Sequence, residues 1–376
     1  MYKILLSSGL SFLITFFSIP AIIRIAKAKK LFAPTNEFYV SKSLVPALGG
    51  VAIFAGFISS ILIFIHPIEF PSLQLLVGSV MIIFFLGLKE DIQILSFSKK
   101  IAGQIIAAII LVYFGNFQIN NLFGLFGVNE ISYFSSILIS LTSILIIINS
   151  FIFMGSIDGL SGIFGLLSAV IFGSYFYIFG DLSFSIVAFS LAAGLFSFLF
   201  FNFSPAKMFI GSTGSLLIGL VHSVLFIKFI NTSGNPSAPF SIASSPALAF
   251  AILMFPIFET IKIFILSTIN NKSTGHKKFL IHHLLIEMGY SNNNAILILV
   301  STNMSVVLLA FIFNNFGTTF LMGSILAIGA VGSFIIYQKY EKISTEKEIN
   351  GFANQHAEIK KINKILTIYN ETVDTD

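Results

Sequence analysis

Long apolar stretches constrain the fold of this chain more than any other feature. A helix needs about 20 apolar residues to cross the hydrocarbon core of a membrane. Eleven stretches approach this length, near residues 4–26, 47–66, 73–88, 101–115, 131–148, 160–180, 184–202, 208–230, 245–267, 294–314 and 318–338. Only 10% of the 376 residues are charged, whereas a soluble domain has about 25%. The sequence therefore predicts an all-α, polytopic membrane protein of eleven transmembrane helices.

Lysine residues distinguish the two sides of this predicted bundle. Loops on one side, near 67–72, 116–130, 181–183, 231–243 and 315–317, contain no Lys or Arg. The other loops hold Lys27, Lys29, Lys30, Lys42, Lys89, Lys99, Lys100, Lys207, Lys272, Lys277 and Lys278. Because cytoplasmic loops carry an excess of Lys and Arg, we expect the second set to be cytoplasmic. This orientation puts the N-terminus outside and the C-terminus inside.

Acidic residues follow the same division, although they contribute little to membrane topology. Of the nine before residue 300, Glu69, Glu130 and Asp181 fall on the outer side. The cytoplasmic side holds the other six, which are Glu37, Glu90, Asp91, Asp158, Glu259 and Glu287. Their clustering is independent support for a functional site at the cytoplasmic face.

Charge balance and cysteine content exclude several classes of function. The net charge of +5 is explained by membrane orientation, so no nucleic-acid partner is expected. The absence of cysteine excludes disulfides, thiol nucleophiles and Cys-based zinc sites. Arg24 is the only arginine. Lysine must therefore supply nearly all the positive charge for a phosphate ligand, without arginine's bidentate fork.

Four polar clusters lie at the ends of apolar stretches, where polar groups beside lipid are costly and often functional. They run from Gly87 to Asp91, 149 to 160, 202 to 215 and 280 to 284. Asp91 can accept a proton from a lipid phosphate or bind Mg²⁺ through oxygen, or it is a solvated charge at a helix end. Asp158 precedes a turn whose backbone amides can cradle a pyrophosphate, and it contacts the ligand or caps the next helix.

The other two clusters also have a structural and a functional interpretation. Gly211, Gly214 and Ser215 are typical of close helix packing in lipid. His282 and His283 can hold a phosphate, or they are ordinary loop histidines. His222, inside an apolar stretch, is expected to be a hydrogen-bonded core residue.

In order and spacing, these clusters resemble the cytoplasmic signatures of the polyprenyl-phosphate N-acetylhexosamine-1-phosphate transferases, glycosyltransferase family 4. The resemblance covers roughly residues 30–290. Five signature positions differ: Glu90, Gly155 and Ser212 replace Asp, Ile152 replaces Asn, and Leu280 replaces His.

The resemblance implies transfer of a sugar 1-phosphate from a UDP-sugar to undecaprenyl phosphate, with release of UMP. This would be the first membrane step of cell-envelope polysaccharide synthesis, at the inner membrane of a bacterium. Mg²⁺ is the implied cofactor, held by Asp91 and Asp158. Its binding would be weakened, because Ser212 stands where the family has an aspartate ligand. The implied catalytic residues are Asp91, Glu90 and Asp158. The implied substrate-binding residues are Asn149, Gly159, Lys100, Asn202, Lys207, His282 and His283.

The altered signature positions leave a second interpretation open. The chain is then a catalytically impaired relative that binds a lipid phosphate or nucleotide sugar, or that assists an active homologue. A transporter is disfavoured because transporter sites lie near the membrane midplane, whereas these clusters gather at one face. A homodimer is a further expectation for the partners of this chain.

The composition changes after Tyr340. Residues 1–340 form the predicted transmembrane domain, and 341–376 form a charged cytoplasmic tail. The apolar residues of the tail favour an amphipathic helix, with a partly ordered segment as the alternative. They are Ile359, Ile362, Ile365, Leu366 and Ile368.

Overall fold

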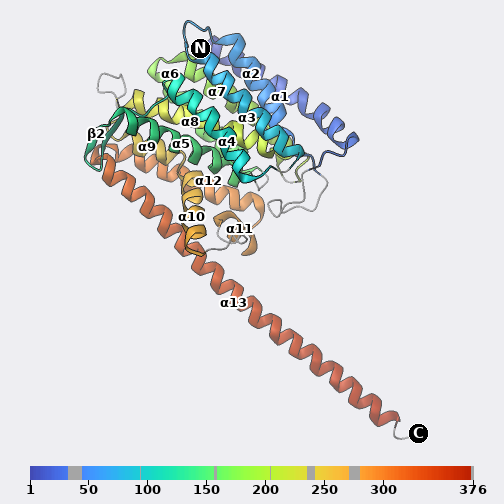
Figure 1. Ribbon diagram of the computed structural model, residues 1–376. Helices are drawn as coiled ribbons and strands as arrows, with labels where there is room; N and C mark the ends of the chain where they lie inside the picture. The colour runs from blue at the N-terminus through green and yellow to red at the C-terminus, as the bar shows by residue number, and fades with distance from the viewer. Residues whose placement is uncertain are drawn as a thin grey trace.

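The computed structural model describes residues 1–32, 45–93, 95–155, 159–203, 205–234, 242–270 and 280–373. Nearly all regular structure in these ranges is helical (Figure 1). The helices before the third polar cluster are α1 (Tyr2–Ala28), α2 (Gly49–Phe64), α3 (Leu73–Ile92), α4 (Phe97–Ile109), the π-helix η1 (Ile110–Phe114), α5 (Tyr133–Met154), α6 (Leu160–Phe179) and α7 (Leu182–Asn202). They are followed by α8 (Gly211–Ser233), α9 (Ser245–Ile252), α10 (Met254–Asn270), α11 (Ile281–Glu287), α12 (Asn292–Ile312), the 3₁₀ turn η3 (Asn314–Phe316) and α13 (Thr318–Val373).

Helix lengths confirm an all-α polytopic membrane protein. Eight described helices are long and apolar enough to cross a membrane, or nine if α9 and α10 together form one bent span. Each of the eleven predicted stretches coincides with a helix or a helix pair. However, α2 has only 16 residues, about 24 Å at 1.5 Å per residue, which is shorter than a hydrocarbon core of about 30 Å. The number of eleven spans therefore remains a prediction.

Helix α8 lies at the centre of the bundle and is buried over nearly its whole length. Glycines let its neighbours approach closely. A Cβ on Gly50 of α2 would lie 2.0 Å from the Gly214 nitrogen, and a Cβ on Gly219 would lie 2.5 Å from the Ile148 Cα of α5. Such contacts are typical of helix association in lipid. His222 of α8 is fully buried and hydrogen-bonded to Ser168 (2.8 Å), which confirms the core role expected for it.

The two ends of the bundle are distinguished by their charges. Because α1 and α2 run antiparallel, with the Ser60 hydroxyl donating to the Ser7 carbonyl (2.6 Å), the start of α1 lies near the end of α2. We call this the N-terminal end, where Lys3 pairs with Glu69 at 3.4 Å. The opposite end contains the start of α8, and we call it the lysine-rich end. It carries Lys27, Lys89, Lys99, Lys100 and Lys207.

The stretch predicted as one span over 245–267 is broken. Helices α9 and α10 meet at an angle of 84°. Asn303 of α12 satisfies backbone groups released at the break, since its side chain accepts from the Phe255 N–H (3.1 Å) and donates to the Ile252 carbonyl (3.3 Å). Irregular backbone within an apolar bundle is stable only when such groups find partners. Pro256, directly after the break, lacks an N–H and favours a bend there.

A short hairpin was not expected from the sequence. Strands β1 (Asn121–Leu125) and β2 (Val128–Glu130) pair antiparallel within the stretch predicted as an outer loop. The Thr319 side chain at the start of α13 bonds both the Gly124 carbonyl (3.0 Å) and the Phe126 N–H (2.7 Å). The hairpin therefore holds the first turn of α13 against the bundle.

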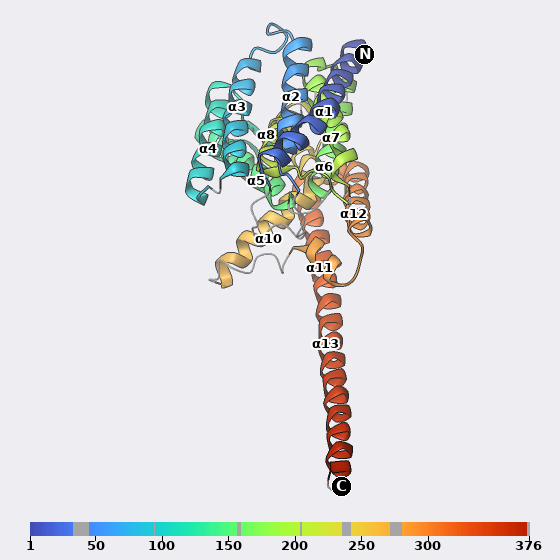
Figure 2. The same cartoon turned by 90° about the vertical axis from the view of Figure 1, so that its right-hand side faces the viewer.

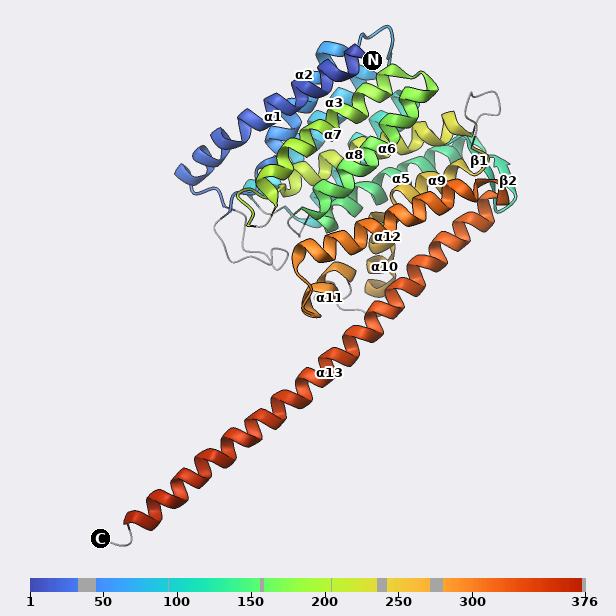
Figure 3. The same ribbon diagram turned by 180° about the vertical axis from the view of Figure 1, so that it is seen from behind.

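Helix α13 continues far beyond the bundle. It runs without a break from Thr318 to Val373, through the predicted domain boundary at residue 340. Its last part projects away from every other labelled element, as Figures 2 and 3 show. The tail is therefore helical as far as Val373, and its amphipathic character stays a prediction. The helix leaves the bundle on the side where α10 and α11 lie (Figure 2).

Candidate active site

Asp91, at the end of α3, binds the first turn of α8 at the lysine-rich end. Its carboxylate accepts hydrogen bonds from the N–H of Ser212 (2.6 Å), the N–H of Thr213 (3.0 Å) and the hydroxyl of Thr213 (2.5 Å). The first N–H groups of a helix lack partners within the helix. Asp91 therefore caps α8 from a neighbouring helix.

Three glycines allow this approach. Gly211 has φ +71°, and an added Cβ would lie 2.1 Å from the Ala47 carbonyl and 2.6 Å from the Asp91 carboxylate. A Cβ on Gly87 would lie 2.5 Å from the Thr213 Cα. Gly50 donates its N–H to the Ile210 carbonyl (2.9 Å). The segment before α2, the end of α3 and the start of α8 thus form one closely packed unit.

Glu90 and Asp91 have different neighbours. Glu90 forms an ion pair with Lys100 of α4, while Asp91 binds α8. Successive residues of a helix do not face the same way, which explains the difference. The other oxygen of Glu90, Oε2, is buried without a hydrogen-bond partner in the described part of the chain. The two carboxylates are therefore not arranged as a pair around one ligand.

Two asparagines of the predicted site join helices. Asn149 of α5 donates to the Gln104 side chain of α4 (2.9 Å) and is nearly buried. Asn202, at the end of α7, accepts from the Gly159 N–H (2.7 Å) and donates to the Met208 carbonyl (2.9 Å). Both functional atoms of the Asn202 side chain are thus occupied. These contacts hold α4 against α5, and the start of α6 against the segment before α8.

Lys207 differs from these residues because it is exposed. Its backbone N–H donates to the Phe201 carbonyl (2.9 Å), which fixes the segment between α7 and α8. The side chain lies four residues before Gly211. Among the predicted substrate-binding residues, it offers a charge on the surface of the lysine-rich end.

A second polar group joins α10 to α11. The buried Glu259 carboxylate accepts from the Lys262 ammonium (2.5 Å) and from the Ile281 N–H (3.0 Å) at the start of α11. His282 follows directly. Its ring is buried and lies against the His283 ring, with centroids 4.4 Å apart and the ring planes tilted by 46°. Glu259 thus holds the two histidines in place.

His282 is the least satisfied polar residue of the site. Neither ring nitrogen has a hydrogen-bond partner in the described ranges. Burial, together with the neighbouring His283 and Lys262, lowers the pKa of His282 well below its usual range. The ring is therefore neutral near pH 7. A buried polar group without a partner costs about 1–3 kcal/mol, so a ligand or water that bonds to it would be stabilising.

The described residues do not form a magnesium site. Mg²⁺ prefers oxygen ligands in nearly ideal octahedral geometry. Asp91 already accepts three hydrogen bonds, and Ser212 is neutral at the position that the family resemblance gives to a carboxylate. No group of three or more His, Cys, Asp or Glu side chains that could hold a metal is found in the ranges described. Asp158 lies outside these ranges, so its role and that of Mg²⁺ remain predictions.

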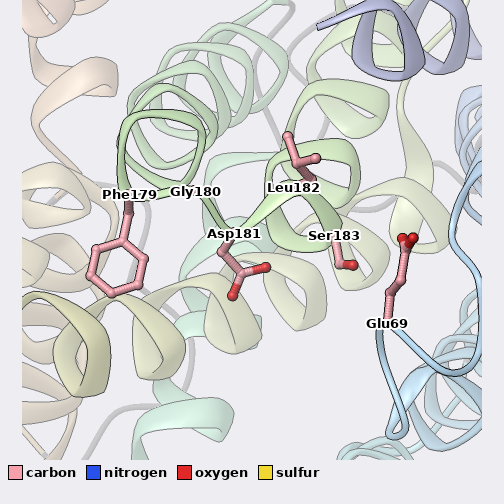
Figure 4. A pocket seen from close by; sticks show the side chains of 6 residues that line it. All are labelled: Glu69, Phe179, Gly180, Asp181, Leu182 and Ser183. Carbon is pink, nitrogen blue, oxygen red and sulfur yellow. The ribbon is translucent and has the colours of Figure 1, made fainter.

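A surface pocket lies at the N-terminal end, a full bundle length from these residues. Its lining is formed by Glu69, Phe179, Gly180, Asp181, Leu182 and Ser183 (Figure 4). Asp181 caps α7 through the Phe184 N–H (3.2 Å) and pairs with Lys228 (3.2 Å). Because Glu69 is also paired with a lysine, both carboxylates are explained by the fold. The pocket is therefore not part of the candidate site.

Comparison with known proteins places this architecture in a family. The family model described as glycosyl transferase family 4 matches residues 73–230, from the start of α3 to near the end of α8. Over these residues the chain is similar to glycosyl transferase family 4. This confirms the family that the four polar clusters resemble.

Three proteins with similar sequences are named for one kind of reaction. A decaprenyl-phosphate N-acetylglucosaminephosphotransferase of Mycolicibacterium smegmatis is 29% identical over 283 residues, 68% of each chain. The Mycobacterium tuberculosis protein of the same name is 27% identical over 316 residues, 76% of each chain. An undecaprenyl-phosphate alpha-N-acetylglucosaminyl 1-phosphate transferase of Escherichia coli O157:H7 is 26% identical over 286 residues, 73% of this chain and 74% of its own.

Sequence reasoning missed two residues of the site. Thr213 was not singled out, although its N–H and hydroxyl both bind Asp91. Glu259 was grouped with the acids of the predicted cytoplasmic side, without a prediction that it holds α11. The available signal was an acidic residue inside an apolar stretch, which usually marks a buried, partnered group.

Proposed function

We propose that this chain transfers an N-acetylhexosamine 1-phosphate from a UDP-sugar to a polyprenyl phosphate, releasing UMP. An oxygen of the lipid phosphate forms a bond to the β-phosphorus of the UDP-sugar. The bond from that phosphorus to the bridging oxygen breaks, and UMP leaves with the electron pair. The match of residues 73–230 to glycosyl transferase family 4 and the names of similar proteins support this reaction.

The lysine-rich end is the proposed location of the reaction, at the cytoplasmic face of a bacterial inner membrane. The positive-inside rule supports this orientation, with the N-terminus outside and α13 projecting into the cytoplasm. The lipid substrate would keep its chain among apolar side chains and bring its phosphate to the helix ends. The UDP-sugar would approach from the cytoplasm.

Phosphoryl transfer depends mainly on positioning and on neutralising the phosphate charge. Asp91 serves here as a positioning residue, because its bonds to Ser212 and Thr213 fix the first turn of α8. Lys207 is exposed and provides positive charge for the diphosphate. The neutral His282 supplies a buried donor or acceptor that lacks a partner among the described residues. The sugar nucleotide is the partner that the proposal gives to His282.

One observation carries the proposal. The ends of α3, α4, α5, α7 and α8 lie close together, and all of them fall within residues 73–230, the range that the family model matches. A UMP-release assay tests it, with detergent-purified protein, undecaprenyl phosphate and a panel of UDP-N-acetylhexosamines. We expect UMP release that requires the lipid phosphate and yields one lipid diphosphate-sugar per UMP. Silence across the panel, with folded protein that still binds polyprenyl phosphate, would contradict the proposal.

A second candidate is a catalytically impaired relative that binds these substrates without reaction. It is favoured by the neutral Ser212 and by the three hydrogen bonds already made to Asp91. Ser212→Asp tests this alternative, with Ser212→Asn as a control of equal size. If the unaltered chain and Ser212→Asn released no UMP while Ser212→Asp did, the chain would be a catalytically impaired relative. Gly155→Asp is less suitable, because a Cβ there would lie 2.5 Å from the Ser215 hydroxyl.

A further inference from the structure

The last part of α13 is a long helix that leaves the bundle alone. Its apolar, span-like part ends at Thr345, while the helix continues to Val373. The extra 28 residues extend about 42 Å at 1.5 Å per residue. Figures 1 and 3 show this part clear of the labelled helices and strands. Most helical stability in proteins comes from packing of an apolar stripe, so this helix needs a partner.

The sequence of this part follows a heptad pattern. Between residues 352 and 373, seven positions are separated alternately by three and by four residues. These positions are 352, 355, 359, 362, 366, 369 and 373. Six of these seven positions are apolar, and the exception is Gln355. They are Phe352, Ile359, Ile362, Leu366, Tyr369 and Val373. This spacing is the a and d pattern of a coiled coil.

The remaining heptad positions identify the kind of partner. The f positions, opposite the a and d stripe, hold Asn350, Ala357, Lys364 and Glu371. Residues 346–376 contain four lysines and six acids, so their net charge is −2. Helices that lie on an anionic membrane surface are rich in Lys and Arg on their polar face. The charge therefore favours a protein partner over the membrane.

We propose that this segment, residues 346–373, forms a parallel two-stranded coiled coil with a second copy of the chain. Every copy crosses the membrane in the same orientation, so two copies present their α13 helices side by side, parallel and in register. In this arrangement each a or d residue meets its own counterpart. The inference concerns assembly and is independent of the proposed reaction.

Cysteine cross-linking tests the register directly, because the chain contains no cysteine. Leu366→Cys places one thiol at an a position, and Lys364→Cys places one at an f position of the same turn. Both full-length variants would be oxidised in native membranes. We expect about tenfold more disulfide-linked dimer for Leu366→Cys. Equal cross-linking of the two variants, or none in either, would overturn the proposal.

A second measurement separates the coiled coil from other occupants. The unaltered chain in lipid nanodiscs should have the mass of a dimer, and Ile359→Asp should give a monomer, while Lys361→Asp leaves the mass unchanged. The competing occupant is the membrane surface. The Leu366→Cys variant could instead be monomeric, with a thiol protected from a water-soluble maleimide only when lipid is present. The row of a and d residues would then lie on the membrane surface, and the proposal would be wrong.

Discussion

At two helix junctions of the lysine-rich end, an acidic side chain of one helix caps the start of another, but the two junctions differ in how fully their polar groups are hydrogen-bonded. At the first, Asp91 of α3 caps α8; at the second, Glu259 of α10 caps α11. The first junction is enclosed by glycines, and all three donors around Asp91 are satisfied. The second leaves both ring nitrogens of the buried His282 without a partner in the described residues.

This difference indicates that one junction has a structural role and the other a ligand-binding role. A polar group that is fully hydrogen-bonded within the protein gains little from a ligand, whereas an unsatisfied one gains a bond that it lacked. The α3–α8 junction therefore provides the rigid frame, and the α10–α11 junction provides a place for a ligand to bond. Catalytic sites need both, since first-contact residues must be held by a second layer of packing.

Replacement of Gly211 by alanine tests the rigid frame and should have the largest effect. A Cβ at this position would lie 2.1 Å from the Ala47 carbonyl at a positive φ. We expect loss of at least about 3 kcal/mol in the free energy of unfolding, measured by thermal unfolding in detergent. Gly323→Ala in α13 is the control, because no atom lies within 4 Å of its added Cβ. Equal stability of the two variants would mean that the α3–α8 packing is not rigid.

Amide substitutions compare the two caps directly. Asp91→Asn replaces an acceptor oxygen with a donor facing the α8 N–H groups, and we expect a loss of about 2 kcal/mol. Glu259→Gln keeps an oxygen for the Ile281 N–H, and Lys262 can turn towards solvent, so about 1 kcal/mol is expected. Chemical or thermal unfolding of both variants gives the comparison. A larger loss for Glu259→Gln would reverse the assignment of frame and binding element.

Acid should weaken the second junction through His282. Burial lowers the pKa of this histidine in the folded state, so below the unfolded value of about 6.5 the unfolded chain binds more protons. Stability should therefore fall as the pH is lowered from 7 to 5, by at most about 1.4 kcal/mol per pH unit from this one group. His282→Gln should reduce that slope, while the control His66→Gln, an exposed site at the N-terminal end, should leave it unchanged. An identical slope in all three proteins would show that His282 is not buried and neutral.

The sequence predicted the architecture better than the contacts of the site. Apolar stretch lengths located every long helix, and lysine spacing separated the two ends, because both patterns are local. The α9–α10 break depends on Asn303, some 50 residues later, and the hairpin depends on Thr318 and Thr319. Such pairings join distant parts of the chain, so spacing within one segment cannot reveal them.

The same reason explains the partial prediction of the candidate site. Family spacing identified Asp91, Asn149 and Asn202, but it did not show that these side chains are occupied by neighbouring helices. The catalytic role that the resemblance implies for Asp91 stays a prediction, and the structure adds that its carboxylate caps α8. Family motifs record which residues are present, while only three-dimensional packing shows which of their atoms remain free.

The most direct test of the account compares one lysine from each end of the bundle in the UMP-release assay. Lys207 is exposed at the lysine-rich end, and Lys3 forms an exposed pair with Glu69 at the N-terminal end. Lys207→Ala should lower kcat/KM for the UDP-sugar roughly tenfold or more, the cost of a lost charged hydrogen bond to phosphate, while Lys3→Ala leaves it unchanged. Equal activity of both variants, or loss confined to Lys3→Ala, would contradict a transferase site at the lysine-rich end.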